Sequence, residues 1–181
     1  MTATAVAPRT IDSDRYRAVM RHLPTGVAAV CSTEPVTGVQ NGMIVGTFAS
    51  LSMEPALVTF SVMHSSTSWP KISDAGTFSI SLLAEDQQQI CRALSAKGED
   101  KLRSVAWSES DWGTPHLHGS LAWFDCRIEQ QFTAGDHIVV IASVLDMTPA
   151  EQASAPLIFH GGRFGSFREA AWAPRPSCDL P

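Results

Sequence analysis

Apolar residues along this chain recur mainly with the two-residue period of β-strands. Alternating or continuously apolar runs predict strands over 26–32, 42–48, 56–62, 76–83, 121–132 and 137–147, and a last strand within 155–167 that a glycine pair interrupts. Within 121–132 the alternation assigns one face to Ala122, Phe124, Cys126, Ile128 and Phe132, and the other to Asp125, Arg127 and Glu129. The chain is therefore expected to be rich in antiparallel strands.

The helical period is confined to short segments. Capping-type residues followed by apolar residues at helical spacing predict a helix from about Ser13 to His22. A short helix is expected around Pro70, a longer one over 84–98 that ends at Gly98, and one further helical turn over 100–105. Residues 108–120 are rich in turn-forming residues and are expected to form a loop.

Together these elements predict a single mainly β domain over 13–170, an antiparallel barrel with a few peripheral helices. A parallel α/β sheet is disfavoured, because the strands do not alternate with long helices. Residues 1–12 are expected to be a flexible leader and residues 171–181 a loose C-terminal tail.

Composition and charge narrow the classes of partner. Of the 181 residues, 44% are hydrophobic and 17% charged, which is typical of a folded protein. The net charge of −5 leaves no basic excess, so nucleic acid and a membrane surface are not expected partners. No signal peptide or membrane span is recognisable, and the cysteines (Cys31, Cys91, Cys126 and Cys178) form no close pair. We therefore expect a cytoplasmic protein with reduced thiols.

Common catalytic motifs are absent, which leaves the histidines as candidates. The chain has no GxGxxG after a strand, no GxxxxGK[ST], no HExxH and no GxSxG. His137 and His160 lie at strand ends beside glycines, which favours a binding site over a purely structural role. His116 and His118 would point the same way on an extended segment and chelate a metal, but without a third ligand nearby a solvated loop is favoured. No metal site is predicted.

The stretch Gly42 to Val62, GMIVGTFASLSMEPALVTFSV, contains unusually many small and hydroxyl-bearing residues. On a strand, Gly46, Phe48, Ser50 and Ser52 would share a face and leave room for a flat ring against the backbone. Ser65, Ser66 and Thr67 follow at a helix start, where hydroxyls and amides can hold a phosphate, with Lys71 nearby. Each cluster alone is more often a turn or a cap. In this order they predict a site for a flat heterocycle with an anionic tail.

Seven segments resemble the flavin reductase family in order and spacing: LPTGVAAVCS, NGMIVGTFASLSMEPALVTFSV, SSTSWPKI, AGTFSISLL, GTPHLHGSLAWFDCRIEQQF, AGDHIVVIASV and PLIFHGGRF. These proteins are the reductase components of two-component flavin-dependent monooxygenases. The resemblance runs from about Arg17 to Phe164. It implies a split antiparallel β-barrel of the Greek-key type and a homodimer that binds FMN or FAD. It also implies hydride transfer from NADH, favoured over NADPH, and diffusion of reduced flavin to a partner monooxygenase.

The resemblance also implies roles for individual residues. Flavin contacts are expected from Val45, Gly46, Thr47, Ser50, Leu51, Ser52 and Ser61, and phosphate contacts from Ser65, Ser66 and Thr67. His137, in the family's GDH segment, is the expected catalytic residue and would position the nicotinamide. His160, Arg163 and Phe164 would line the same groove. Ser81 departs from the asparagine common in the family, and the hydroxyl-rich 65–67 loop leaves the choice between FMN and FAD open.

Two other functions remain open from the sequence. A non-catalytic flavin-binding carrier or sensor would bind flavin without oxidising NAD(P)H. A flavoenzyme related to pyridoxamine-phosphate oxidase would hold its flavin tightly, and such enzymes favour Arg and Lys around the phosphate. The hydroxyl-rich loop argues mildly against this second alternative.

Overall fold

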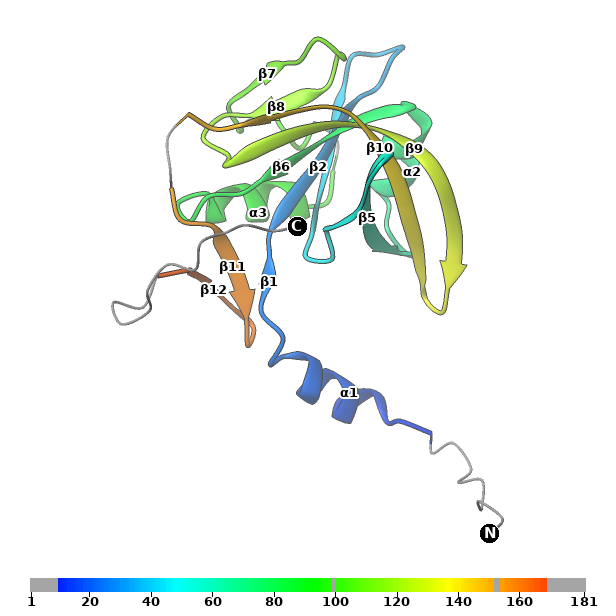
Figure 1. Cartoon of the computed structure of the whole chain (residues 1–181), viewed down its shortest axis with the longest axis vertical. Helices are drawn as coiled ribbons and strands as arrows, with labels where there is room; N and C mark the ends of the chain where they lie inside the picture. The colour runs from blue at the N-terminus through cyan, green and yellow to red at the C-terminus, as the bar shows by residue number, and fades with distance from the viewer. Residues whose placement is uncertain (1–9, 99, 152–153, 169–181) are drawn as a thin grey trace.

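One antiparallel sheet of seven strands dominates the molecule (Figure 1). The computed structural model describes residues 10–98, 100–151 and 154–168, so the predictions for residues 1–9 and for the 171–181 tail lie outside the described residues. The strand order is β3 (Gln40–Val45), β2 (Ala28–Thr33), β6 (Thr77–Leu82), β9 (Ala122–Ala134), β10 (His137–Pro149), β5 (Ala56–Met63) and β4 (Ala49–Met53). Every pairing in it is antiparallel, which confirms the prediction of a mainly β, antiparallel fold.

The remaining elements are short and surround this sheet. A three-stranded sheet joins β1 (Thr25–Gly26), β11 (Leu157–His160) and β12 (Arg163–Ser166), and a two-stranded ribbon joins β7 (Trp107–Glu109) and β8 (Pro115–Leu117). The helices are α1 (Ser13–Met20), α2 (Trp69–Asp74) and α3 (Gln88–Ser95). Figure 1 shows α1 projecting away from the body of the molecule, and none of its residues is buried. Of the described helices, none has the length and apolar character required to cross a bilayer.

Strand β2 divides the core into two apolar clusters. Its alternate residues Ala28 and Val30 pack with Phe60, Trp69 and Phe78, while Ala29 and Cys31 pack with a second group that includes Leu94, Leu102 and Leu117. Burial on both faces explains the continuous apolar run and confirms β2 as a buried strand. Cys31 and Cys126 are fully buried, as expected for small hydrophobic residues, and burial raises the pKa of each thiol to about 12.

Because of a β-bulge in β9, Phe132 lies on the opposite face of the strand from the one predicted. Ile141 pairs with Gln130 and Ala142 with Ile128, so Glu129 is an extra residue in β9. The inserted residue reverses the alternation beyond it. Phe124, Cys126 and Ile128 therefore lie in or against the core, whereas Phe132 is 46% exposed and Gln131 accepts a hydrogen bond from the Trp69 indole at 3.0 Å.

The 108–120 segment is a ribbon rather than the predicted loop, and it covers the carboxylate of Asp125, which the sequence placed on the same face as Arg127 and Glu129. Residues of β7 and β8 pair directly, with Ser108 opposite His116. Asp125 on β9 is only 3% exposed and accepts hydrogen bonds from Ser110, Thr114 and His116. These bonds replace the lost water, since a buried carboxylate needs polar partners.

The helices lie where the sequence predicted them, but they are shorter than predicted. The predicted 84–98 helix shortens to α3, and the expected helical turn over 100–105 consists of hydrogen-bonded turns, with Arg103 N donating to Asp100 O at 3.2 Å. Residue Lys101 of this segment is held on two sides, because its ammonium donates to Ser68 Oγ at 2.8 Å and to Leu94 O at 2.9 Å. The segment thus links the end of α3 to the start of α2.

Candidate active site

The chain bends where the sequence predicted a continuous strand. Strand β3 ends at Val45 and β4 begins at Ala49, so the predicted strand over 42–48 is wrong in its last three residues. A Cβ on Gly46 would lie 3.0 Å from Thr25 Oγ1, closer than most Cβ contacts. The glycine therefore favours the close approach of β1 at this bend. Val45 is buried in the core, which leaves its backbone as the part that can meet a ligand.

Thr47 fixes the bend to strand β5. Its hydroxyl oxygen accepts a hydrogen bond from Ser61 N at 2.9 Å and donates one to Ser61 O at 3.1 Å. Pairing of β4 with β5 ends at Ala49 and Thr59, so Ser61 lies just beyond the last strand partner on this edge. The threonine side chain thus replaces a backbone partner for Ser61.

Phe48, Ser50 and Ser52 line an apolar cavity of about 250 Å³ between β4, β5, β9 and β10. The other lining residues are Met53, Ala56, Leu57, Val58, Phe124, Val144 and Met147. The pairing of β4 shifts register between Ser50 and Ser52, so Leu51 is the extra residue and is 48% exposed. Ser50 and Ser52 thus line one cavity with Phe48, and its other walls are apolar, but the register shift at Leu51 interrupts the regular alternation from which the sequence placed them on one strand face.

The turn from β5 into α2 contains the predicted phosphate residues. Ser66 Oγ accepts a hydrogen bond from Trp69 N at 3.2 Å and so has a capping role. The side chains of Ser65 and Thr67 form no hydrogen bond with the described residues and remain available to a ligand. Lys101, which the sequence reasoning missed, brings a cation to the neighbouring Ser68, and desolvation and the charge of Lys71 lower its pKa.

His137 begins β10 beside this turn. It pairs with Met63 at the end of β5, and its Nδ1 lies 2.6 Å from Asp136 Oδ1. His64, also missed from the sequence, donates its backbone N–H to Asp136 O at 3.0 Å. The hydrogen bond with His137, followed by the electrostatic interaction with its ring, lowers the pKa of Asp136, with a smaller contribution from His64. We call Thr47, Ser61, the 64–67 turn, Asp136 and His137 the β5 cluster.

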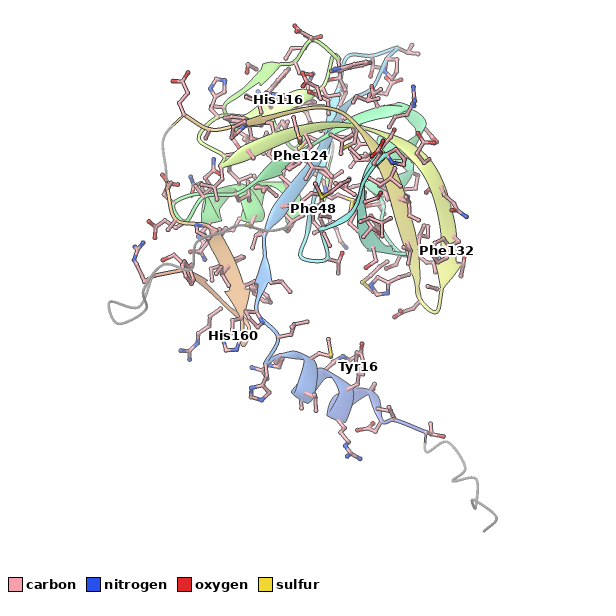
Figure 2. All side chains as sticks on the ribbon, viewed as in Figure 1. Tyr16, Phe48, His116, Phe124, Phe132 and His160 are labelled. Atoms are coloured by element: carbon pink, nitrogen blue, oxygen red, sulfur yellow. The ribbon has the colours of Figure 1, made fainter. Side chains whose placement is uncertain are left out.

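His160, Arg163 and Phe164 do not join the β5 cluster within one chain. They belong to the β11–β12 hairpin, where Phe159 and Phe164 lie 5.3 Å apart and Arg21 donates to Gly161 O at 3.4 Å. In Figure 2, His160 lies near α1, and Phe132, in the β9–β10 hairpin with His137, lies on the other side of the molecule. Within one chain this hairpin therefore lies apart from the end of the sheet that carries His137, and a groove shared by these residues stays a prediction. The sequence alone could not give this separation, because it depends on how the sheet curves.

The fold and the β5 cluster define a class of protein: a mainly β domain with hydroxyl groups around the end of one strand and an Asp–His pair beside it. A family model described as a flavin reductase like domain matches residues 20–168. The chain belongs to this family.

Similar proteins span nearly the whole chain. A flavin reductase from Pseudomonas putida is 41% identical over 165 residues, covering 91% of this chain and 96% of the relative. The reductase subunit HsaB of a flavin-dependent monooxygenase from Rhodococcus jostii is 36% identical over 172 residues, covering 95% and 87%. The crystal structure of nitrilotriacetate monooxygenase component B from Mycobacterium thermoresistibile superposes with a TM-score of 0.84 at 30% identity and 92% coverage of both chains. An NADH:FAD oxidoreductase from Streptomyces globisporus, solved with NAD and FAD fragments, has a TM-score of 0.80 at 27% identity, covering 91% and 99%.

Proposed function

We propose that this protein is an NADH-dependent flavin reductase that releases reduced FMN or FAD to a partner monooxygenase. The observation that carries the proposal is the β5 cluster, in which Thr47 binds Ser61 on one side of β5 and His137 pairs with Met63 on the other, in a chain that belongs to the flavin reductase like family. The names of the relatives include both flavin reductases and monooxygenase reductase subunits. Flavin supplies the acceptor for hydride from the nicotinamide, and solvent supplies the accompanying proton.

The residues of the β5 cluster fit a flat ring with an anionic tail. The Thr47 hydroxyl holds Ser61 and the bend in place, so the backbone at 46–48 is a fixed surface for the ring. Ser65 and Thr67 have hydroxyls available for a phosphate, and Lys101 places a cation on Ser68, the next residue of the chain. His137, oriented by Asp136, would position the nicotinamide rather than act as an acid, because hydride transfer needs no protein nucleophile.

We further propose that the sheet forms a split barrel and that two chains form the active dimer. Strands β3 and β4 are the two edges of the sheet and are joined by the short Gly46–Phe48 bend, which supports closure at this point. Helix α1 has eight residues and none is buried, and isolated helices of this length are unstable in water. Tyr16, Val19 and Met20 form an exposed apolar stripe on it. A second copy would cover this stripe and bring a β11–β12 hairpin towards the β5 cluster.

The dimer is tested by Val19→Asp, which places a charge in the stripe. We expect the variant to be monomeric in sedimentation velocity and to lose most of its reductase activity. Arg15→Glu, on the same helix but at an exposed polar position, is the matched control and should remain dimeric. A Val19→Asp protein that stays dimeric would show that α1 is not the interface.

The activity is tested by stopped-flow oxidation of NADH and of NADPH with free FMN and free FAD as acceptors. We expect turnover with excess flavin, faster with NADH. Flavin binding without NADH oxidation would identify the non-catalytic carrier instead. Flavin that stays bound through many turnovers would favour the pyridoxamine-phosphate-oxidase-like alternative, because a diffusible product must leave.

A further inference from the structure

A second polar site lies under the β7–β8 ribbon, away from the β5 cluster. Ser108, His116, His118, Gly119, Trp123 and Thr148 line an open cavity of about 360 Å³. Figure 2 shows His116 at the opposite end of the molecule from α1 and well away from Phe132. A neighbouring cavity shares Gly119, Trp123 and Thr148 and adds two carboxylates, Asp86 and Glu151. No Lys or Arg of the described chain lines either cavity, so the local charge favours a cation.

The buried Asp125 orients the ring of His116. Asp125 Oδ2 lies 3.1 Å from His116 Nε2, and Ser110 and Thr114 donate to the other carboxylate oxygen. The contact with Asp125 occupies Nε2 and turns the other ring nitrogen, Nδ1, away from the carboxylate. Nδ1 has no hydrogen-bond partner among the described residues and is the nitrogen that faces a ligand.

His118 presents a second imidazole to the same cavity. Leu117 between the two histidines is fully buried, so His116 and His118 lie on the outward side of the extended segment. The backbone of His118 is held at both ends, because its N–H donates to Ala106 O at 3.0 Å and its carbonyl accepts from Gln87 Nε2 at 2.7 Å. The exposed ring itself has no hydrogen bond to a described residue.

We propose that His116 and His118 bind a divalent transition metal ion such as Cu²⁺, Ni²⁺ or Zn²⁺. Imidazole nitrogen suits these ions better than Mg²⁺ or Ca²⁺, which prefer oxygen. The Asp125–His116 pair matches the carboxylate–histidine arrangement that orients metal-binding histidines in proteins. No group of three His, Cys, Asp or Glu residues is placed to hold a metal in the described part of the chain, so water would complete the coordination. The site is open and exchangeable.

The test uses the tag-free full-length protein, titrated with Cu²⁺ and with Ni²⁺. His116 stacks on Trp123 with ring centroids 5.9 Å apart and planes at 14°, so bound Cu²⁺ should quench the fluorescence of Trp123. Calorimetry with Ni²⁺ gives the stoichiometry, for which we expect one ion per chain. His118→Ala removes an exposed side chain and is expected to leave the fold intact while weakening binding at least tenfold. Asp125→Asn should weaken it by about 10–100-fold.

Two control variants test whether the metal binds at His116 and His118 rather than elsewhere on the protein. His22→Ala, an exposed histidine on another part of the surface, should bind metal like the wild type. His64→Ala tests the alternative that metal binds beside Asp136 and His137. Wild-type affinity in His118→Ala, loss of binding in His64→Ala instead, or no binding up to millimolar metal would each overturn the proposal. Should Asp125→Asn fail to fold, the comparison of His118→Ala with His22→Ala still decides. The results for His118→Ala and His22→Ala do not bear on the flavin reductase activity, because both residues lie outside the β5 cluster.

Discussion

Replacing Thr47 with valine removes the two hydrogen bonds that fix the bend between β3 and β4. Valine has nearly the same shape as threonine but neither donates nor accepts. Ser61 N and Ser61 O, which face the Thr47 hydroxyl at 2.9 and 3.1 Å, would lose their partner beyond the end of β4. Thr47→Ser keeps the hydroxyl and is the matched control.

The magnitude follows from the bonds lost. Each side chain–backbone hydrogen bond contributes a net ~0.5–1.5 kcal/mol, and these two lie near the surface, where water partly replaces them. We expect the free energy of unfolding to fall by about 1–2 kcal/mol in Thr47→Val. For a domain of this size that corresponds to a Tm lowered by about 3–6 °C. Thr47→Ser should stay within about 0.5 kcal/mol of the wild type, the usual range for surface substitutions.

The same variants separate stability from binding. Chemical denaturation gives the free energy of unfolding, and quenching of flavin fluorescence gives the dissociation constant for FMN and FAD. If the 46–48 backbone is the surface for the ring, Thr47→Val should weaken flavin binding by roughly tenfold, equivalent to about 1.4 kcal/mol. Wild-type stability in Thr47→Val, or equal damage in Thr47→Ser, would refute the reasoning, because either result would mean that the hydroxyl does not hold the bend.

Three further predictions concern other parts of the molecule. His137→Ala should raise the Michaelis constant for NADH more than it raises the dissociation constant for flavin; equal losses in steady-state and binding measurements would contradict its role. Asp125→Asn should lower stability by about 2–3 kcal/mol at about pH 7. Folding lowers the pKa of Asp125, so the stabilisation by its carboxylate is present above the unfolded pKa and is lost as the pH falls through the folded pKa. In urea unfolding, the difference in unfolding free energy between wild type and variant should therefore shrink below about pH 4. A gap that persists in acid would exclude the carboxylate charge as its cause. Gly42→Ala would place a Cβ 2.7 Å from Leu94 Cδ2 in the core and should lower the free energy of unfolding by about 1–2 kcal/mol. A Cβ at Gly26 would meet nothing within 4 Å, so Gly26→Ala should be nearly neutral in the same denaturation experiment.

The sequence by itself determined the fold class and the family of this protein. The period of its apolar residues is local information. It identified β2, β5 and β9, because side chains alternate along any strand, and it correctly gave only short helices within the described residues. The resemblance to flavin reductases likewise rested on short segments whose order survives without knowledge of the packing, and the family match over residues 20–168 confirmed it.

The tertiary structure decided what depends on neighbours distant in sequence. The extra residue Glu129 turned Phe132 outward, and the close approach of Thr25 accounted for Gly46. Contacts across many residues also brought Lys101 to Ser68 and enclosed Asp125 beneath the β7–β8 ribbon. A bulge, a covered carboxylate or a lysine that reaches another element leaves no periodic signal, because its cause is packing between segments rather than the pattern within one.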